Sequence, residues 1–395
     1  MLFSVKDTFR AMVEYDSDGK NTVIYDDFGN PNVVVIISKY DMSLLGISEL
    51  PSGTHPAFII NGEKEVDEIF VGKYDSVLGD GNVCTSMIGD PMELKGHLDT
   101  DKYVQQCIRR KGKGWHAMTS IEWGAVALIS WKLGTIPHGN MNWGGSSVAA
   151  GEYAIPASKQ TLRDAFMYNG NTYGIGSTKT GTGPASWSHD GTTAGIYDMV
   201  GNTNNIYTPG ALNLRGEFLL HGRDNAVCNM VDVDDSPDIN DINGYIRTGI
   251  YCNLSAKGQP GNIGLRSECA QYGLRNLDDD SREPSDSVAR FGDYSTHYSE
   301  SVYKDLRDCT WYDVKPRWEL IAHGIMSPDK NTEARSCIRI GGKRLLRRGN
   351  SVAACETQYQ ESIFETHFDQ CNRNLMWDTH ANCTVSSSRV VYIPR

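Results

Sequence analysis

A stretch in the middle of the chain, SWSHDGTTAGIYDMVGNTNNI (residues 186–206), combines side chains that could do chemistry. His189 and Asp190 could act as an acid–base pair, and Asp198 among glycines and asparagines could help to hold a metal. No nucleophile that would partner His189 can be identified from the sequence. We therefore interpret Trp187, His189 and Asp190 as a structural cluster and expect no catalytic residues here.

Other metal-binding patterns are weaker. A zinc set of His367, Asp369, Cys371 and His380 has irregular spacing, so we do not favour it. An acidic run resembles a calcium loop only loosely, because Pro237 stands where an EF-hand needs glycine, and a solvated acidic turn is the preferred interpretation. The run consists of Asp232, Asp234, Asp235, Asp238 and Asp241.

Composition limits the class of protein. The 38 Lys and Arg against 49 Asp and Glu give a net charge of −11, which argues against a nucleic-acid-binding protein. The 40 glycines and a mean hydropathy of −0.42 indicate a soluble, loop-rich chain. The sequence has neither an apolar run long enough for a membrane helix nor a secretory signal. We therefore expect that the protein does not insert into a membrane and that it is made in a cytoplasm. The ten cysteines form no CxxC motif and are expected to be free, mostly buried thiols.

Several elements must position these residues. The first 60 residues are predicted to be rich in strands, at NTVIYDD and NPNVVVIISKY, and residues 55–79 to form two strands around an NGE turn. Residues 99–114 suggest a helix with a basic end. The clearest helix is 119–134: Thr119 or Ser120 can cap it and Gly134 can end it. Its apolar stripe is predicted to face the core, with Trp123 and Leu128 largely buried; the stripe comprises Ile121, Ala125, Leu128, Ile129 and Trp131.

Regular periodicity nearly vanishes after residue 135, although a short helix is expected within residues 303–325 and a strand at SSSRVVYIPR (386–395). Long irregular segments in a folded chain commonly carry function.

Three motifs in this order resemble a known family: GWHAMTSIEWGAVALISWKLGTIPHGN, GTGPASWSHDGTTAGIYDMVGN and GGKRLLRRGN. They are similar to the formylglycine-generating-enzyme (sulfatase-modifying-factor) branch of the C-type lectin fold. The closer similarity is to its non-enzymatic bacteriophage tail and receptor-binding proteins, some of which retroelements diversify near the C-terminus. The resemblance covers about residues 54–395, and residues 225–335 match poorly. It implies an α+β, C-type-lectin-like domain at 55–395 with an insertion at about 225–335, preceded by a β-rich attachment or oligomerisation segment at 1–54.

The resemblance also implies a calcium loop, because relatives coordinate Ca²⁺ with a segment of the form G-[IL]-x-[DN]-x-x-G-N-x-x-E-W. Here Asn205 replaces the Glu and Ile206 the Trp, so one carboxylate is lost and binding should weaken. A hydrogen-bonded, Asx-rich turn is the preferred alternative, and no cofactor is required. The implied ligands are Asp198, Gly201, Thr203 and Asn205.

An oxidoreductase of the formylglycine-generating type is the alternative function. It would need two closely spaced cysteines near the C-terminus to hold copper, and Cys355, Cys371 and Cys383 are not so spaced. The C-terminus instead resembles the phage binders: KRLLRRGNSV opens the variable region and SSSRVVYI closes it, although Asn350 departs from the pattern.

Between these motifs, Ile363, Phe364 and Phe368 are predicted to lie in the core. The other side chains mix aromatic, amide and charged groups without secondary-structure periodicity, as recognition surfaces do, with an ordinary polar loop as the alternative. The predicted ligand-binding residues are Tyr359, His367, Asp369, Asn372, Asn374, Trp377, Asp378, His380 and Asn382, with Arg373 among them.

The resulting expectation is a bacteriophage virion protein, a tail-fibre tip or receptor-binding protein located in the tail. Its partners would be a host-cell surface receptor, either glycan or protein, and other tail proteins. We expect a homo-oligomer such as a trimer. A head-decoration or other structural virion protein with the same fold remains an alternative that the sequence does not separate from it.

Overall fold

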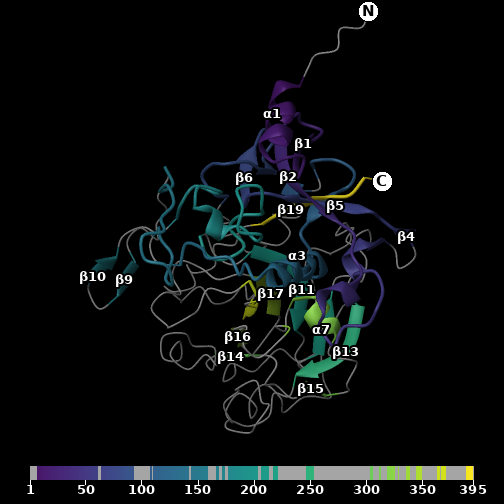
Figure 1. Ribbon diagram of the computed structural model, residues 1–395. Helices are drawn as coiled ribbons and strands as arrows, with labels where there is room; N and C mark the ends of the chain where they lie inside the picture. Colours follow the sequence, from purple (N-terminus) through teal and green to yellow (C-terminus); the bar gives the residue numbers. More distant parts are fainter. Residues whose placement is uncertain are drawn as a thin grey trace, which may run out of the picture.

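The computed structural model describes residues 7–60, 64–92, 107–108, 110–141, 144–158, 166–168, 171–173, 177–202, 206–212, 217–220, 246–252, 303–305, 311–312, 318–324, 328, 335–338, 344–348, 363–364, 366–370 and 388–394. Its structure mixes α and β elements, and most of them are strands (Figure 1). Within these residues, no helix has both the length and the apolar character that a bilayer span requires.

The first of two large sheets has five antiparallel strands. The β1–β2 hairpin turns at Asp26, whose Oδ1 accepts hydrogen bonds from the backbone N–H groups of Phe28 and Asn30, both at 3.0 Å. This sheet joins distant parts of the chain, because β19 near the C-terminus lies between β5 and β8. In spatial order the strands are β1 (Asn21–Tyr25), β2 (Pro31–Ser38), β5 (Glu68–Gly72), β19 (Val390–Tyr392) and β8 (Trp115–Ala117).

The second large sheet has eight strands, which pair antiparallel except for the parallel β16–β18 pair. In spatial order they are β14 (Tyr303–Asp305), β16 (Arg335–Ile338), β18 (Thr366–Gln370), β17 (Arg344–Arg348), β11 (Ile206–Leu212), β12 (Glu217–Leu220), β13 (Ile246–Cys252) and β15 (Trp311–Tyr312).

Three small hairpins complete the described strands: β3 (Ile59–Ile60) with β4 (Lys64–Glu65), β6 (Ser76–Gly79) with β7 (Val83–Ser86), and β9 (Phe166–Tyr168) with β10 (Asn171–Tyr173). The helical elements are α1 (Thr8–Asp16), α3 (Ser120–Leu133) and α7 (Trp318–Ala322), and the short 3-10 turns η1 (Met42–Leu45), η2 (Pro56–Phe58) and η4 (Ala185–Trp187).

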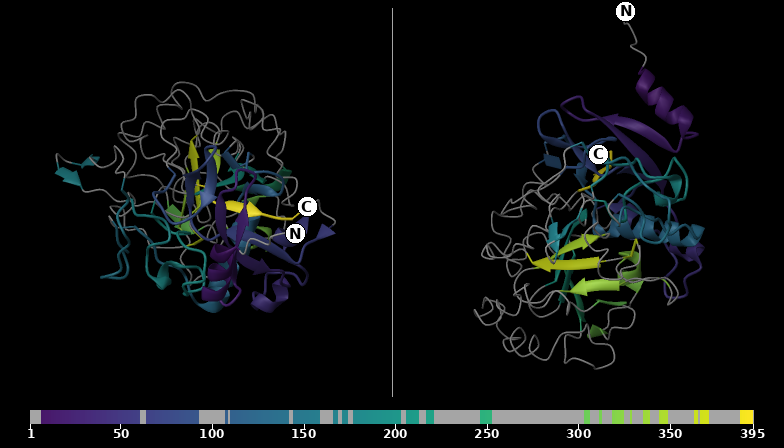
Figure 2. Two further views of the ribbon diagram at one scale, coloured as in Figure 1. Left: turned by 90° about the horizontal axis from the view of Figure 1, so that it is seen from above. Right: turned by 90° about the vertical axis from the view of Figure 1, so that its left-hand side faces the viewer.

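Helix α3 lies between the two large sheets (Figures 1 and 2). Thr119 and Glu122 form a reciprocal capping box at its start, and Gly134 ends it in a left-handed conformation, as the sequence predicts. The helix is buried on nearly all sides, because Trp123, Ala125 and Leu128 face different neighbours and are all inaccessible. The sequence predicts one apolar face toward the core, whereas the structure buries residues on most sides of this helix.

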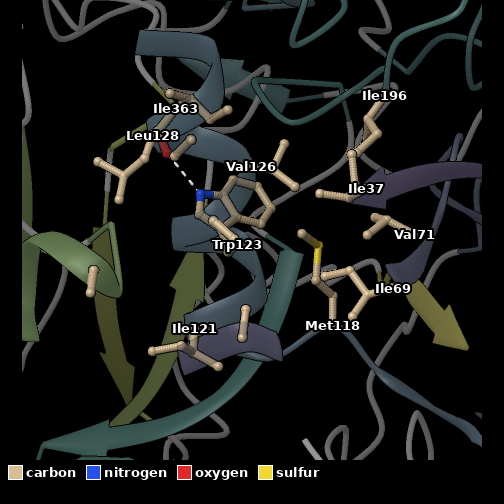
Figure 3. Packing of buried hydrophobic residues seen from close by; sticks show 14 of the residues in the cluster. Ile37, Ile69, Val71, Met118, Ile121, Trp123, Val126, Leu128, Ile196 and Ile363 are labelled. Atoms are coloured by element: carbon tan, nitrogen blue, oxygen red, sulfur yellow. Dashed lines mark hydrogen bonds between the residues drawn. The ribbon is translucent and has the colours of Figure 1, made fainter. Parts of the chain in front are cut away.

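The main core surrounds α3. The Trp123 indole N–H donates to the carbonyl oxygen of Ile363 at 2.8 Å, which ties the helix to a C-terminal segment (Figure 3). On the opposite side, Met118 packs with Ile69 and Val71 of β5 in the same cluster. One apolar core thus joins elements from the beginning, middle and end of the chain.

Gly124 allows α7 to approach α3. A Cβ at this position would collide with the backbone of Ala322 and His323. The predicted short helix in this region is confirmed by α7, and its close packing explains why the middle of α3 carries a glycine despite the helix-propensity cost.

The two early strands, the β3–β4 hairpin and the terminal strand β19 are confirmed, but the sequence analysis did not anticipate α1. Of the predicted 99–114 helix, residues 107–108 are helical, residues 110–114 form turns and irregular backbone that lead into β8, and the rest lies outside the described residues. The segment 1–54 is joined to the rest of the chain, because β2 pairs with β5 over five residue pairs.

The burial of Leu128 leads to a first prediction. Replacing Leu128 by alanine should lower the free energy of unfolding by roughly 2–5 kcal/mol, because it leaves a cavity in the main core. Chemical denaturation of wild type and variant would measure this difference. The matched change Leu133→Ala, at a residue more than half exposed at the end of the same helix, should have a much smaller effect. Equal losses in both variants would contradict the role assigned to Leu128.

Candidate functional site

The 196–202 loop is held by backbone contacts on two sides. The Asn202 N–H donates to the Asn140 carbonyl at 2.8 Å, and the Asn202 side chain exchanges hydrogen bonds with Thr178. Gly201 adopts a positive φ of 73° and lies so close to Asn140 that a Cβ would collide with its backbone. Glycine at 201 is thus required by conformation and by packing.

Asp198 lies in this loop, buried and with a left-handed φ of 57°. Its Oδ2 accepts a hydrogen bond from the Gly181 N–H at 2.7 Å. Burial raises the pKa of Asp198 to about 6, although the nearby Arg389 guanidinium and the Gly181 N–H oppose this rise. The carboxyl group therefore faces the interior and titrates close to neutral pH.

Arg389 supplies the positive charge beside Asp198. Its guanidinium is fully buried and donates to Asp75 Oδ1 at 2.6 Å, to the Tyr197 carbonyl at 2.6 Å and to the Gly72 carbonyl at 2.7 Å. We call Asp75, Asp198 and Arg389 the buried charge cluster. It links the 196–202 loop, the end of β5 and the start of β19, so a C-terminal side chain holds the loop in place.

The predicted calcium ligands are only partly within the described residues. Asp198 and Gly201 lie in the loop described above, whereas Thr203 and Asn205 lie outside the described residues. Among the described residues, no group of three or more His, Cys, Asp or Glu side chains is arranged to hold a metal ion. Asp198 contacts a backbone N–H and faces a guanidinium, an environment that disfavours a divalent cation.

A second prediction follows from this geometry. Adding a calcium chelator should leave the unfolding temperature unchanged, because Arg389 already provides the cation that Asp198 faces. Thermal unfolding with and without added calcium would measure the effect, with Asp198→Asn as the matched variant. A ligand of the native state would raise the unfolding temperature in a concentration-dependent way. Such a rise, lost in Asp198→Asn, would show that the loop binds calcium.

Trp187, His189 and Asp190 each take part in hydrogen bonds that hold neighbouring loops together. His189 Nδ1 accepts a hydrogen bond from the Ile196 N–H at 2.8 Å, and burial lowers the pKa of His189 to about 4. The imidazole is therefore neutral at pH 7 with its proton on Nε2. The Asp190 carboxylate accepts a hydrogen bond from the Thr192 N–H at 2.9 Å and so closes the turn that follows His189.

A partly exposed polar network around Glu152 was not predicted from the sequence. The Glu152 carboxylate accepts hydrogen bonds from His138 Nδ1 at 2.9 Å, Ser186 Oγ at 2.7 Å and the Trp187 indole N–H at 2.9 Å. Burial acts to raise the pKa of Glu152, but these three hydrogen bonds outweigh it and lower the pKa. The neighbouring Tyr153 is 68% exposed. No local motif links these residues, since the network forms only when three loops meet.

The C-terminal binding residues are placed only in part. His367 and Asp369 lie in β18, where they pair with Arg347 and Leu345 of β17. The sequence of this segment shows no secondary-structure periodicity, yet residues 366–370 form a strand, because they pair with the distant strands β16 and β17. The remaining predicted binding residues lie outside the described residues: Tyr359, Asn372, Arg373, Asn374, Trp377, Asp378, His380 and Asn382.

Two core predictions next to this segment are confirmed, since Ile363 and Phe364 are fully buried. Ile363 lies in a turn, and its carbonyl oxygen accepts a hydrogen bond from the Trp123 indole N–H. The backbone that precedes β18 is therefore anchored to α3.

The comparisons with known proteins give no family assignment. Neither the family models nor the curated proteins that were searched match this chain.

Proposed function

We propose that this chain is a bacteriophage virion protein, a tail-fibre tip or receptor-binding protein, that recognises a host-cell surface molecule through its C-terminal segment. The observation that supports this proposal most directly is the pairing of β19 with β5 and β8. β5 begins soon after the predicted domain start at residue 55, so the two ends of that domain meet in one sheet. This closure is what the resemblance to the C-type lectin fold implies.

The arrangement separates stability from recognition. The main core around α3 and the buried charge cluster hold the ends of the C-terminal segment, at Ile363 and at Arg389. Functional residues on loops held by a rigid scaffold are common, and both ends of this segment are anchored in the described structure. The proposed binding surface is formed by Tyr359, His367, Asp369, Asn372, Asn374, Trp377, Asp378, His380 and Asn382.

Recognition would be non-covalent and multivalent. Several copies on one particle can raise a modest affinity by about 10² to 10⁴ when their sites engage together. A homo-oligomer would provide this multivalency, and the segment 1–54 would connect it to other tail proteins. The receptor would be a surface glycan or protein of the host cell.

The third prediction tests the proposed surface. Trp377→Ala should abolish attachment to host cells, since an aromatic anchor can carry about 2 kcal/mol or more of binding free energy. Its free energy of unfolding should change by no more than roughly 0.5 kcal/mol, as at other surface positions. Adsorption of particles that carry the variant would be measured beside chemical denaturation of the purified protein.

Two exposed tyrosines serve as controls. Tyr15→Ala on α1, where the side chain is 86% exposed, should leave adsorption unchanged. Tyr153→Ala tests the 135–185 loops as the alternative binding surface. Unchanged adsorption of the Trp377 variant together with lost adsorption of the Tyr153 variant would move the binding surface to those loops.

A further inference from the structure

Two cysteines from separate segments lie together in a second apolar cluster. Cys84 is in β7 and Cys107 comes shortly before β8, and both are buried, at 0% and 3% exposed. We call this group the cysteine cluster; it consists of Cys84, Met92, Cys107, Ile108, Trp115, Ala117 and Val390. Neither cysteine is part of the buried charge cluster or of the proposed binding surface, so no function discussed above explains their placement.

The thiols are in direct contact. The Cys84 side chain shares a hydrogen bond with that of Cys107, and neither sulfur is in a disulfide bond. Cys84 Sγ also lies 3.4 Å from Met92 Sδ and accepts a hydrogen bond from Ser388 Oγ at 3.4 Å. Met92, Ser388 and Cys107 thus surround the Cys84 side chain, and the Cys107 thiol is the neighbour with which it could form a disulfide bond.

We propose that Cys84 and Cys107 are a modification site, at which a disulfide bond forms when the protein meets an oxidising disulfide compound. The bond would close the chain between residues 84 and 107 into a loop and connect β7 to the segment that leads into β8. It would thereby link the β6–β7 hairpin covalently to the edge of the five-stranded sheet. This inference does not depend on the proposed function.

The reaction is an ordinary two-step thiol–disulfide exchange. The thiolate of one cysteine attacks a sulfur of the disulfide compound, forms a mixed disulfide and releases one thiolate. The second cysteine thiolate attacks the protein sulfur of this mixed disulfide and releases the second thiolate. The two protein thiols are oxidised by two electrons, the compound is reduced to two thiols, and the protons lost by the cysteines are taken up by the released thiolates.

The reaction should be slow in the folded protein. Burial, and then the hydrogen bond with Cys107, raise the pKa of Cys84 well above its usual value. Little thiolate is present at neutral pH, and the reagent can reach the pair only when the cluster opens. A protein made in a reducing cytoplasm would keep both thiols until long exposure to an oxidising medium, and the rate of oxidation should rise with pH.

The test uses the full chain and oxidised glutathione. Protein refolded in a glutathione redox buffer, so that access does not limit the reaction, is digested with trypsin without reduction. Cleavage gives the peptides 74–95 and 103–109, each with one cysteine. We expect these two peptides to be linked, with a mass about 2 Da below their sum, and reduction to separate them.

Variants give a second measurement. Oxidised wild-type protein should unfold roughly 3–5 °C above the reduced protein, because the bond restricts the unfolded chain. Cys84→Ala and Cys107→Ala should each remove the difference, whereas Cys337→Ala, in β16, should keep it. The proposal is overturned if the two peptides remain unlinked after refolding in the redox buffer, or carry glutathione or another cysteine instead.

Discussion

Replacing Arg389 by methionine is expected to lower the free energy of unfolding by about 3–5 kcal/mol near pH 7.5, the usual cost of removing one partner from a buried ion pair. Methionine approximates the volume of the side chain but leaves Asp75 and Asp198 buried together without a positive charge. It also removes the donors for the carbonyl groups of Gly72 and Tyr197. Chemical denaturation across a pH series would measure the loss.

The pH dependence of the stability loss in Arg389→Met shows whether unpaired buried charge causes it. Without Arg389 the folded-state pKa values of Asp75 and Asp198 should rise further above those of the unfolded chain. A carboxyl group with a raised folded-state pKa favours folding when it is protonated, and this contribution is lost as the pH rises through the folded-state value. The difference in the free energy of unfolding between wild type and Arg389→Met should therefore shrink as the pH falls from about 7.5 toward 5.

Arg389→Lys is the matched control. Lysine keeps the charge but has no planar fork to reach Asp75 and two carbonyl groups at once, so we expect a smaller loss than for methionine. A methionine variant whose deficit is the same at every pH would contradict the buried-charge explanation and indicate a packing defect.

The elements that the sequence predicts correctly are those with local signals. The capping box of Thr119 and Glu122 and the stop at Gly134 lie within a few residues of the helix ends that they define. The β-branched run of β2 and the turn before it are likewise local. Helix α1 has one local signal, the cap Asp7, whose Oδ1 accepts a hydrogen bond from the Arg10 N–H at 3.0 Å. None of its residues is buried and no acidic residue lies in its first turn, so a buried apolar face does not mark this helix.

The candidate site was harder to predict because its contacts join distant positions. Arg389 was part of a closing motif in the sequence, but its partner Asp75 precedes it by most of the chain. Glu152, His138 and Ser186 come from three loops and share no spacing rule. His367 and Asp369 were chosen by residue type, and the pairing that places them in β18 depends on β16 and β17. Residue type can suggest which side chains are able to bind, but long-range pairing decides where they lie.

Lys111 is the clearest case of a residue whose place depends on distant partners. In the sequence it belongs to the basic end of a predicted helix, yet its ammonium group is completely buried. Lys111 Nζ lies 2.9 Å from Asp26 Oδ2 and 2.9 Å from Asn32 Oδ1, and 4.4 Å from the centre of the Trp115 ring. Burial lowers the pKa of Lys111, and the Asp26 carboxylate opposes this by stabilising the charged form.

Lys111→Met should therefore lower the free energy of unfolding by about 3–5 kcal/mol, because it leaves the Asp26 carboxylate buried without its cation. The double variant Lys111→Met/Asp26→Asn should recover at least half of that loss. An asparagine Oδ1 can still accept the hydrogen bonds that hold the β1–β2 turn, at Phe28 and Asn30, and it carries no charge. Denaturant unfolding of both single variants and the double variant gives the coupling between the two residues.

The exposed ion pair of Lys39 with Glu65 and Asp67 provides the control for this experiment. Lys39→Met removes a lysine with two carboxylate partners at 3.1 Å, but water screens these charges, so stability should be nearly unchanged. A large loss at Lys111 beside no measurable loss at Lys39 would show that burial, and not the number of ion pairs, determines the cost. If the double variant is as unstable as Lys111→Met alone, the loss comes from the contact with Trp115 or from packing, and the unpaired charge on Asp26 is not its cause.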